Sequence, residues 1–213
     1  MQKEQKSADT VLENGISEAA RELSLAERAR RDVAVFGNVR VLCFAAMLAA
    51  MSLIIGKFLQ IPNPFQNIIR ISFENLPILL AGISMGPFVG ALTGIVADLL
   101  GCVLYGYAIN PVITLGAAAI GLISGVMANY VVRRPRIARV ICAAVVSHLV
   151  GSVVIKSLGL AAWFLGSYDM GLAELMLWRL LTYAVICTAE CVLLCLLLRH
   201  RAVATLFERM RQK

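Results

Sequence analysis

The sequence predicts an all-α integral membrane protein, built as a bundle of six transmembrane helices. Of its 213 residues, 60% are hydrophobic, and the mean hydropathy is +0.81. A soluble domain of this size could not bury so much apolar surface, so lipid must cover part of it. The apolar stretches are long enough for membrane helices, and the charged residues collect between them and at the two ends of the chain.

The first half of the chain predicts three helices. Residues 41–59 form the first, close to the about 20 residues needed to cross the hydrocarbon core. Two prolines and two asparagines in QIPNPFQNIIR then predict a structured loop. Residues 71–104 would reach about 50 Å as a single helix, too long for a core of about 30 Å. Gly86-Pro87 breaks this stretch into two short helices joined by a tight turn.

The second half predicts three more spans, at residues 112–132, 140–162 and 172–198. The loop YGYAINP precedes them, and RRPRIAR and FLGSYDMG separate them. We therefore divide the chain into a polar N-terminal extension with an amphipathic helix (1–38), a membrane domain (39–199) and a basic tail (200–213).

The positive charges predict that both termini are cytoplasmic. Basic residues near membrane helices favour the inside, and here they gather before the first span, after the fourth and after the sixth. They are Arg28, Arg30, Arg31, Arg40, Arg133, Arg134, Arg136, Arg139, Arg199, Arg201, Arg209, Arg211 and Lys213. The net charge of +7 is therefore interpreted as membrane topology, and we expect no nucleic-acid partner.

Small residues recur at helical spacing in two places. Gly82, Gly86, Gly90 and Gly94 lie four residues apart, which predicts close helix packing, and Asp98 continues this face toward the bundle. In the first span, small residues also pair four positions apart. These are Ala45 with Ala49 and Ala46 with Ala50. The spacing fits an internal seam or a docking face for another membrane subunit, and by itself it favours the seam.

Charged and aromatic residues gather at the predicted outer ends of the helices. They are Lys57, Arg70, Glu74, Tyr105, Tyr107, Lys156, Trp163, Arg179 and Tyr183. Snorkelling cations and an aromatic belt would explain any one of them. Four cations on the less positive side are harder to explain in this way. A cavity open to the outside and lined by cations and aromatics would suit an anionic aromatic ligand.

Other patterns exclude several chemistries. The six cysteines lie inside apolar stretches without a C-x-x-C pair, so we expect small packing residues and no metal site. The chain lacks the G-x-x-x-x-G-K-[ST] loop of ATPases. Ser147 and His148 are adjacent and therefore do not face each other on a helix. We expect no catalytic residues, no cofactor and no enzymatic activity.

One segment resembles a known family. RISFENLPILLAGISMGPFVGALTGIVADLLG, residues 70–101, is similar to the signature region of the folate-specific substrate-binding (S) components of energy-coupling factor transporters. The alanine-rich first span and LMLWRLLTYAV around Arg179 agree with this resemblance. It extends over about residues 40–198.

The resemblance implies a fold of S-component type in a bacterial cell membrane. It also implies a function: capture of folate or a reduced folate from outside, and delivery through a membrane coupling subunit (T component) driven by two cytoplasmic ATPases. Site residues Arg70, Phe73, Glu74 and Arg179 match family positions, and the four alanines map onto the surface that contacts the coupling subunit. The alternatives are an S component for another anionic vitamin or precursor, and a stand-alone secondary carrier.

Overall fold

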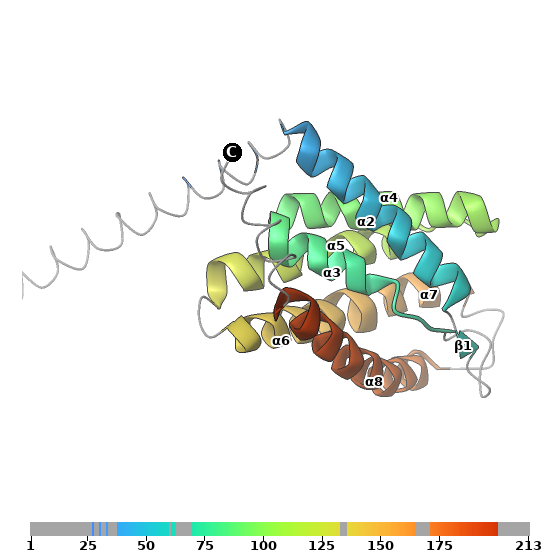
Figure 1. The fold of residues 1–213 in the computed structure, drawn as a ribbon. Coiled ribbons are helices and arrows are strands. Elements are labelled where there is room, and N and C mark those ends of the chain that lie inside the picture. Colours follow the sequence, from blue (N-terminus) through green and yellow to red (C-terminus); the bar gives the residue numbers. More distant parts are fainter. Residues whose placement is uncertain are drawn as a thin grey trace, which may run out of the picture.

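The computed structural model describes residues 38–59, 61–62, 70–132, 136–164 and 171–199, together with residues 27, 30 and 33. The described chain is almost entirely helical (Figure 1). Its α-helices are α2 (Val39–Phe58), α3 (Asn75–Met85), α4 (Pro87–Tyr105), α5 (Pro111–Val126), α6 (Arg136–Ser147), α7 (Lys156–Phe164) and α8 (Leu172–Arg199). Two π-helical segments continue them: η2 (Met127–Val131) extends α5, and η3 (His148–Ile155) joins α6 to α7.

These elements form six continuous helical segments in the described chain, as predicted: α2, α3, α4, α5–η2, α6–η3–α7 and α8. Five are long and apolar enough to cross a membrane, and α3, with 11 residues, is shorter. The break at Gly86-Pro87 is confirmed, because Gly86 has a φ of 104°, which favours glycine, and Pro87 starts the next helix. The prediction of two short helices needs one correction: α4 has 19 residues, enough to cross the membrane.

Two short strands after α2 form a pairing that the sequence pattern did not indicate. Strands β1 (Ile61–Pro62) and β2 (Arg70–Ile71) pair antiparallel, with Pro62 opposite Arg70. They lie at the end of the bundle where α2 ends (Figure 1). Residues 63–69 lie outside the described residues, as do most of the predicted N-terminal extension and the whole basic tail.

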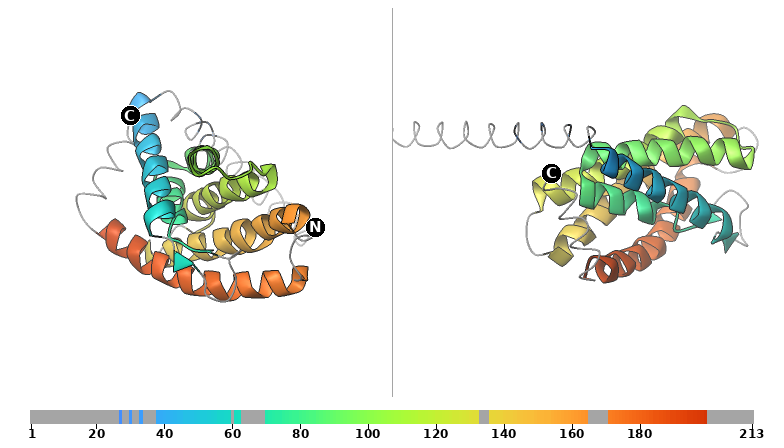
Figure 2. Two further views of the ribbon diagram at one scale, coloured as in Figure 1. Left: turned by 90° about the vertical axis from the view of Figure 1, so that its right-hand side faces the viewer. Right: turned by 45° about the horizontal axis from the view of Figure 1, so that its top comes forward.

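The glycine face packs α3 and α4 against α5. A Cβ at Gly90 would overlap the carbonyl oxygen of Gly121, and a Cβ at Gly121 would overlap that of Gly90. Only glycine allows two backbones to approach this closely, so the predicted packing role is confirmed. Helices α4 and α8 lie on opposite sides of the bundle, with α5 and η3 between them (Figures 1 and 2).

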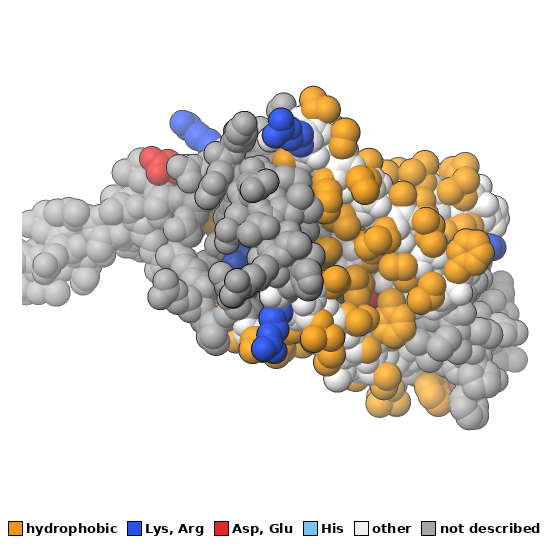
Figure 3. All heavy atoms as spheres, viewed as in Figure 1, with side chains coloured by type: hydrophobic (Ala, Val, Ile, Leu, Met, Phe, Trp, Pro, Cys, Tyr) orange, Lys and Arg blue, Asp and Glu red, His pale blue; other side chains and the backbone are white. Residues whose placement is uncertain are grey.

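The outer surface of the bundle is apolar. Figure 3 shows hydrophobic side chains across most of the described surface on one face. Large apolar side chains are exposed on the long helices, for example Val103 on α4 at 68% and Val185 on α8 at 70%. Exposed apolar area on this scale fits a surface covered by lipid.

The four alanines of α2 divide between two faces. Ala45 and Ala49 are 6% and 2% exposed and belong to the core, as the spacing alone favoured. Ala46 and Ala50 are exposed on the other face. Because a buried side chain offers no surface to a second subunit, a docking role for Ala45 and Ala49 would need the helices to part. The docking hypothesis therefore keeps only Ala46 and Ala50.

Candidate ligand-binding site

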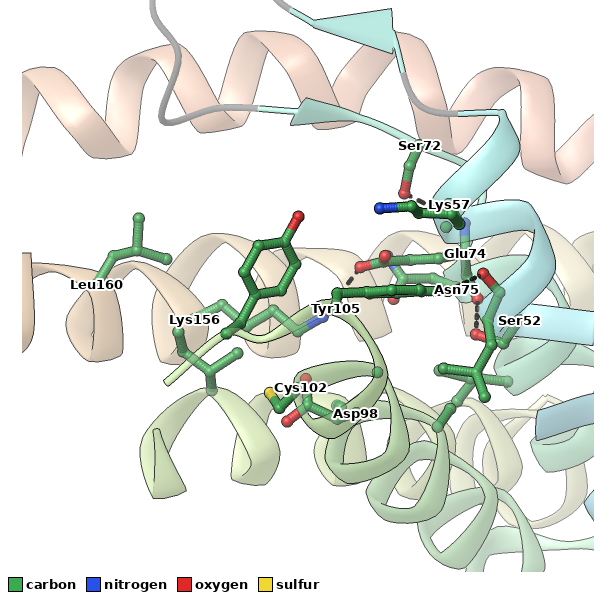
Figure 4. A pocket seen from close by; sticks show the side chains of 18 of the residues that line it. Ser52, Lys57, Ser72, Glu74, Asn75, Asp98, Cys102, Tyr105, Lys156 and Leu160 are labelled. Atoms are coloured by element: carbon green, nitrogen blue, oxygen red, sulfur yellow. Dashed lines mark hydrogen bonds and ion pairs between the residues drawn. The ribbon is translucent and has the colours of Figure 1, made fainter. Parts of the chain in front are cut away.

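A cavity of about 550 Å³ lies between the end of α2, the start of α3, the end of α4 and the outer parts of α5, α7 and α8 (Figure 4). Seven of the charged and aromatic residues predicted at the outer ends line it: Lys57, Glu74, Tyr105, Tyr107, Lys156, Arg179 and Tyr183. Its size is that of sites for vitamin-sized small molecules. The structure therefore brings together predicted side chains that are up to 126 positions apart in the sequence (57 to 183).

The start of α3 forms one wall of the cavity. The Ser52 hydroxyl of α2 donates to the Glu74 carbonyl oxygen at 2.6 Å, and the Glu74 N–H donates to the Ser72 hydroxyl at 3.4 Å. These bonds fix the corner between β2 and α3. The Glu74 carboxylate lies 3.8 Å from the Lys156 ammonium (Figure 4). The side chain of Arg70, four residues before Glu74, lies outside the described residues.

Aromatic and basic side chains form the wall between α2 and α4. The Lys57 ammonium lies 5.0 Å from the centre of the Tyr105 ring, a cation–π contact. The Tyr105 hydroxyl donates to the Leu53 carbonyl oxygen, which holds the ring against α2. Tyr107 meets Tyr105 edge to face at 6.0 Å. A flat ligand can stack on such rings while its anionic groups approach Lys57.

Arg179 of α8 forms the opposite wall and is only 6% exposed. Its Nε donates to the Ser152 carbonyl oxygen at 3.2 Å, and its guanidinium lies 5.4 Å from the centre of the Tyr183 ring. In the described part of the chain, no carboxylate lies within ion-pair distance of Arg179. Burying a guanidinium without a counter-ion costs desolvation free energy, and an anionic ligand in the cavity would offset this cost.

Asn75 is a site residue that the sequence analysis missed. It lines the cavity (Figure 4) and is 1% exposed. Neither its amide nitrogen nor its amide oxygen has a hydrogen-bond partner among the described residues. Buried amides are nearly always paired, so this one has a donor and an acceptor to offer to a ligand. The sequence analysis considered charged and aromatic residues and therefore did not select Asn75. An uncharged polar residue beside Glu74 in an apolar helix could have indicated a ligand-binding position.

Asp98 also lines the cavity, and its carboxylate accepts a hydrogen bond from the Thr114 hydroxyl at 2.7 Å. It therefore faces the bundle, as predicted. The described lining residues thus include two carboxylates, Glu74 and Asp98, and three cations. The cations are Lys57, Lys156 and Arg179. The wall is net positive, which favours an anionic ligand.

Two predicted positions are not placed by the structure, and one lies elsewhere. The side chains of Arg70 and Trp163 lie outside the described residues, so their roles stay predictions. Phe73 is half-buried and is not among the residues that line the cavity. In the described chain, no group of three histidine, cysteine or acidic side chains is placed to hold a metal ion.

Comparisons with known proteins identify the family of this chain. The family model of the ECF transporter, substrate-specific component, matches residues 40–195. The folate transporter FolT of Clostridium novyi (strain NT) is 31% identical over 90 residues, which are 42% of this chain and 51% of that protein. The chain thus aligns with about half the length of this curated relative.

A solved structure shows a related fold. The crystal structure of FolT bound with folic acid aligns with a TM-score of 0.58 and 23% sequence identity. The alignment covers 81% of this chain and 95% of that one. Because the family model spans nearly all the described helices, this chain belongs to the substrate-specific components of ECF transporters and is a multi-pass protein of the bacterial cell membrane.

Proposed function

We propose that this chain binds a folate-class molecule from outside the cell and delivers it through a coupling subunit and two ATPases. The observation that carries the proposal is Arg179, a buried guanidinium in the cavity wall without a carboxylate partner in the described chain. A folate ends in a glutamate with two carboxylates, and a planar guanidinium binds such groups through paired hydrogen bonds.

The rest of the cavity suits the other parts of a folate. Asn75 and Glu74 lie next to each other at the start of α3, where an amide and a carboxylate can pair with the amino-pyrimidine edge of a pterin. Tyr105 and Tyr107 offer ring faces. Arg70, in strand β2 two residues before Ser72, is a second candidate for the glutamate tail. The names of the relatives, which bind or transport folate, point the same way.

The transport partners follow from the proposal. The chain carries no nucleotide-binding loop, so it cannot couple ATP hydrolysis to uptake by itself. In this proposal the exposed Ala46 and Ala50 of α2 meet the coupling subunit, and the protein binds its ligand without transforming it. The N-terminal extension and the basic tail then lie in the cytoplasm.

Ligand identification tests the proposal directly. The small molecule that co-purifies with the protein should be a folate, and purified protein should bind added folate in a one-to-one ratio. Vesicles that contain only this chain should bind folate but not accumulate it. Adding the coupling subunit and the ATPases should give ATP-dependent uptake.

The outcomes separate the alternatives. A different co-purifying vitamin would replace folate as the ligand and keep the S-component function. Concentrative uptake by this chain alone, driven by an ion gradient, would support a secondary carrier. Asp98 and Glu190 would then be the first residues to examine, as ionisable groups within the spans.

A further inference from the structure

A change of helical register in the fifth span removes the expected Lys156 donor from the Ser152 carbonyl. In an α-helix, the N–H of Lys156 would donate to the carbonyl of Ser152, four residues earlier. In η3 it donates instead to Gly151, five residues earlier. The Ser152 carbonyl accepts from Nε of Arg179 at 3.2 Å. The π-helical turn thus brings an acceptor to a ligand-site residue of α8, a use typical of such turns at functional sites.

A buried polar pair lies behind the same residues. The His148 ring binds the Glu190 carboxylate through Nε2, and its Nδ1 lies 3.1 Å from the Ser152 hydroxyl. His148 is 2% exposed and Glu190 and Ser152 are 0% exposed. Two apolar side chains would fill this space at lower cost, because a buried ionisable pair must offset its desolvation. The pair therefore calls for an explanation beyond stability.

This pair touches the cavity wall without lining the cavity. The His148 ring stacks on Tyr183 at 5.3 Å between centres and 29° between planes. Tyr183 is one helical turn from Arg179, and its hydroxyl lies 3.5 Å from the Arg179 guanidinium. Both Tyr183 and Arg179 line the cavity, whereas His148 and Glu190 do not. The contacts run from Glu190 through His148 to the two ligand-facing side chains.

We propose that His148 and Glu190 are positioning residues that fix Tyr183 and Arg179 in the ligand-binding wall. This inference rests on the proposed function, in which Arg179 binds a carboxylate of the ligand. Glu190 holds the His148 ring, the ring holds Tyr183, and the Ser152 backbone holds Nε of Arg179. Because Arg179 is already held in place, its guanidinium presents the remaining N–H groups to the cavity and loses little conformational entropy when the ligand binds. Such preorganisation raises ligand affinity.

The test replaces the whole pair so that no buried charge is left alone. His148→Phe with Glu190→Leu keeps the ring and the volume but removes the hydrogen bonds, and such replacements are tolerated in other buried pairs. We expect the ligand-free unfolding temperature to stay near that of the wild type. Folate affinity should fall at least about tenfold. For 6-hydroxymethylpterin, which lacks the glutamate tail, the fall should be less than about threefold.

A double-mutant cycle with Arg179→Gln separates positioning from general stability. If the pair acts through Arg179, its removal should cost almost no further folate affinity in the Arg179→Gln background. Additive losses, or equal losses for folate and 6-hydroxymethylpterin, would overturn the proposal. Ser147→Ala is the matched control, because this buried hydroxyl precedes His148 but, among the described residues, bonds only to the Ala143 carbonyl of its own helix.

Two further measurements keep the test decisive. Glu190→Gln keeps a hydrogen-bond acceptor for His148, so this variant should lose less than about threefold in folate affinity. This expectation does not depend on the result for the double variant. A loss of about tenfold in Glu190→Gln would contradict positioning by this bond. If the wild type binds no folate, the proposed function alone fails. The cycle is then measured with the small molecule that co-purifies with the wild type, and additive losses of its affinity would overturn the coupling of His148 to Arg179.

Discussion

The two ends of α3 differ in how their buried carbonyl and amide groups are paired, while the Ser84 hydroxyl near its end has no partner among the described residues. At its end, the Gly82 carbonyl accepts from the Gly86 N–H at 3.1 Å and from the Asn129 amide at 3.4 Å. The Ile83 carbonyl accepts from the Arg139 guanidinium at 3.0 Å. At its start, the Asn75 amide is as deeply buried but has no partner among the described residues.

This contrast separates structure from function within one helix of 11 residues. In a membrane, buried polar groups normally find partners inside the protein, because lipid offers none. The paired carbonyl groups therefore contribute to folding, and in the proposed function a ligand completes the Asn75 amide. Arg139 belongs to the paired end, since its guanidinium donates to the Ile83 carbonyl oxygen and to the Asn129 amide oxygen.

The largest effect is expected where α4 and α5 pack against the end of α3, at Gly82, Gly90 and Gly121. Gly121→Leu should prevent folding, because any Cβ there overlaps the carbonyl of Gly90, and overpacking costs about 1–3 kcal/mol even where side chains can shift. Size-exclusion chromatography in detergent should show little folded protein. Gly171→Ala, where a Cβ meets nothing, is the control. A Gly121→Leu protein with the wild-type unfolding temperature would show that this contact does not exist.

The next effect concerns Arg179. Arg179→Gln should cost folate about 1.5–3 kcal/mol of binding free energy, as expected for a hydrogen bond to a charged group. Without ligand, the unfolding temperature should stay at or above that of the wild type, because a buried unpaired charge is removed. Calorimetric titration and thermal unfolding measure the two. Arg199→Gln, exposed at the end of the same helix, should change neither. A loss of stability without a loss of affinity would make Arg179 a structural residue.

The sequence predicted the helices better than the site. Long apolar runs and the Gly86-Pro87 break predict the spans directly. In lipid, backbone N–H and C=O groups must bond to each other, so an apolar run of sufficient length forms a helix. The outer-end charges Glu74, Lys156 and Arg179 were found because charge in a span is conspicuous. Asn75 was missed because it carries no charge, and whether an amide has a partner depends on distant residues.

Other features depended on packing between helices. The partner of Glu74 among the described side chains is Lys156, 82 positions later, and no local spacing could indicate it. The division of the four alanines into a buried and an exposed pair follows from the rotation of α2, which overlapping small-xxx-small patterns leave open. The register change in η3 leaves no clear mark in HLVGSVVI, because it is stabilised by contacts to α5 and α8.

A smaller effect compares two asparagines directly. Asn75→Leu should raise ligand-free stability by about 1–2 kcal/mol, because it removes a buried amide without a partner, and should lower folate affinity by about 1–3 kcal/mol. Asn129→Leu should lower stability by about 1–3 kcal/mol, since it removes bonds to Gly82 and Arg139, and should leave affinity nearly unchanged. Denaturation in detergent and folate titration of both variants decide. The same sign of stability change in both would contradict the contrast between the two ends.

The smallest effect on the chain itself is expected on the exposed face of α2. Ala46→Trp should leave folate affinity and unfolding temperature within error of the wild type, because the side chain points away from the core. It should nevertheless stop uptake in vesicles that contain the coupling subunit and the ATPases, since a bulky side chain would keep the two helix surfaces apart. Ala49→Trp, one turn away but 2% exposed, is the counterpart. It should overpack the core at a cost of about 1–3 kcal/mol and weaken binding as well. Normal uptake by Ala46→Trp would move the docking surface elsewhere, and a loss of folate affinity in that variant would assign Ala46 to the internal seam.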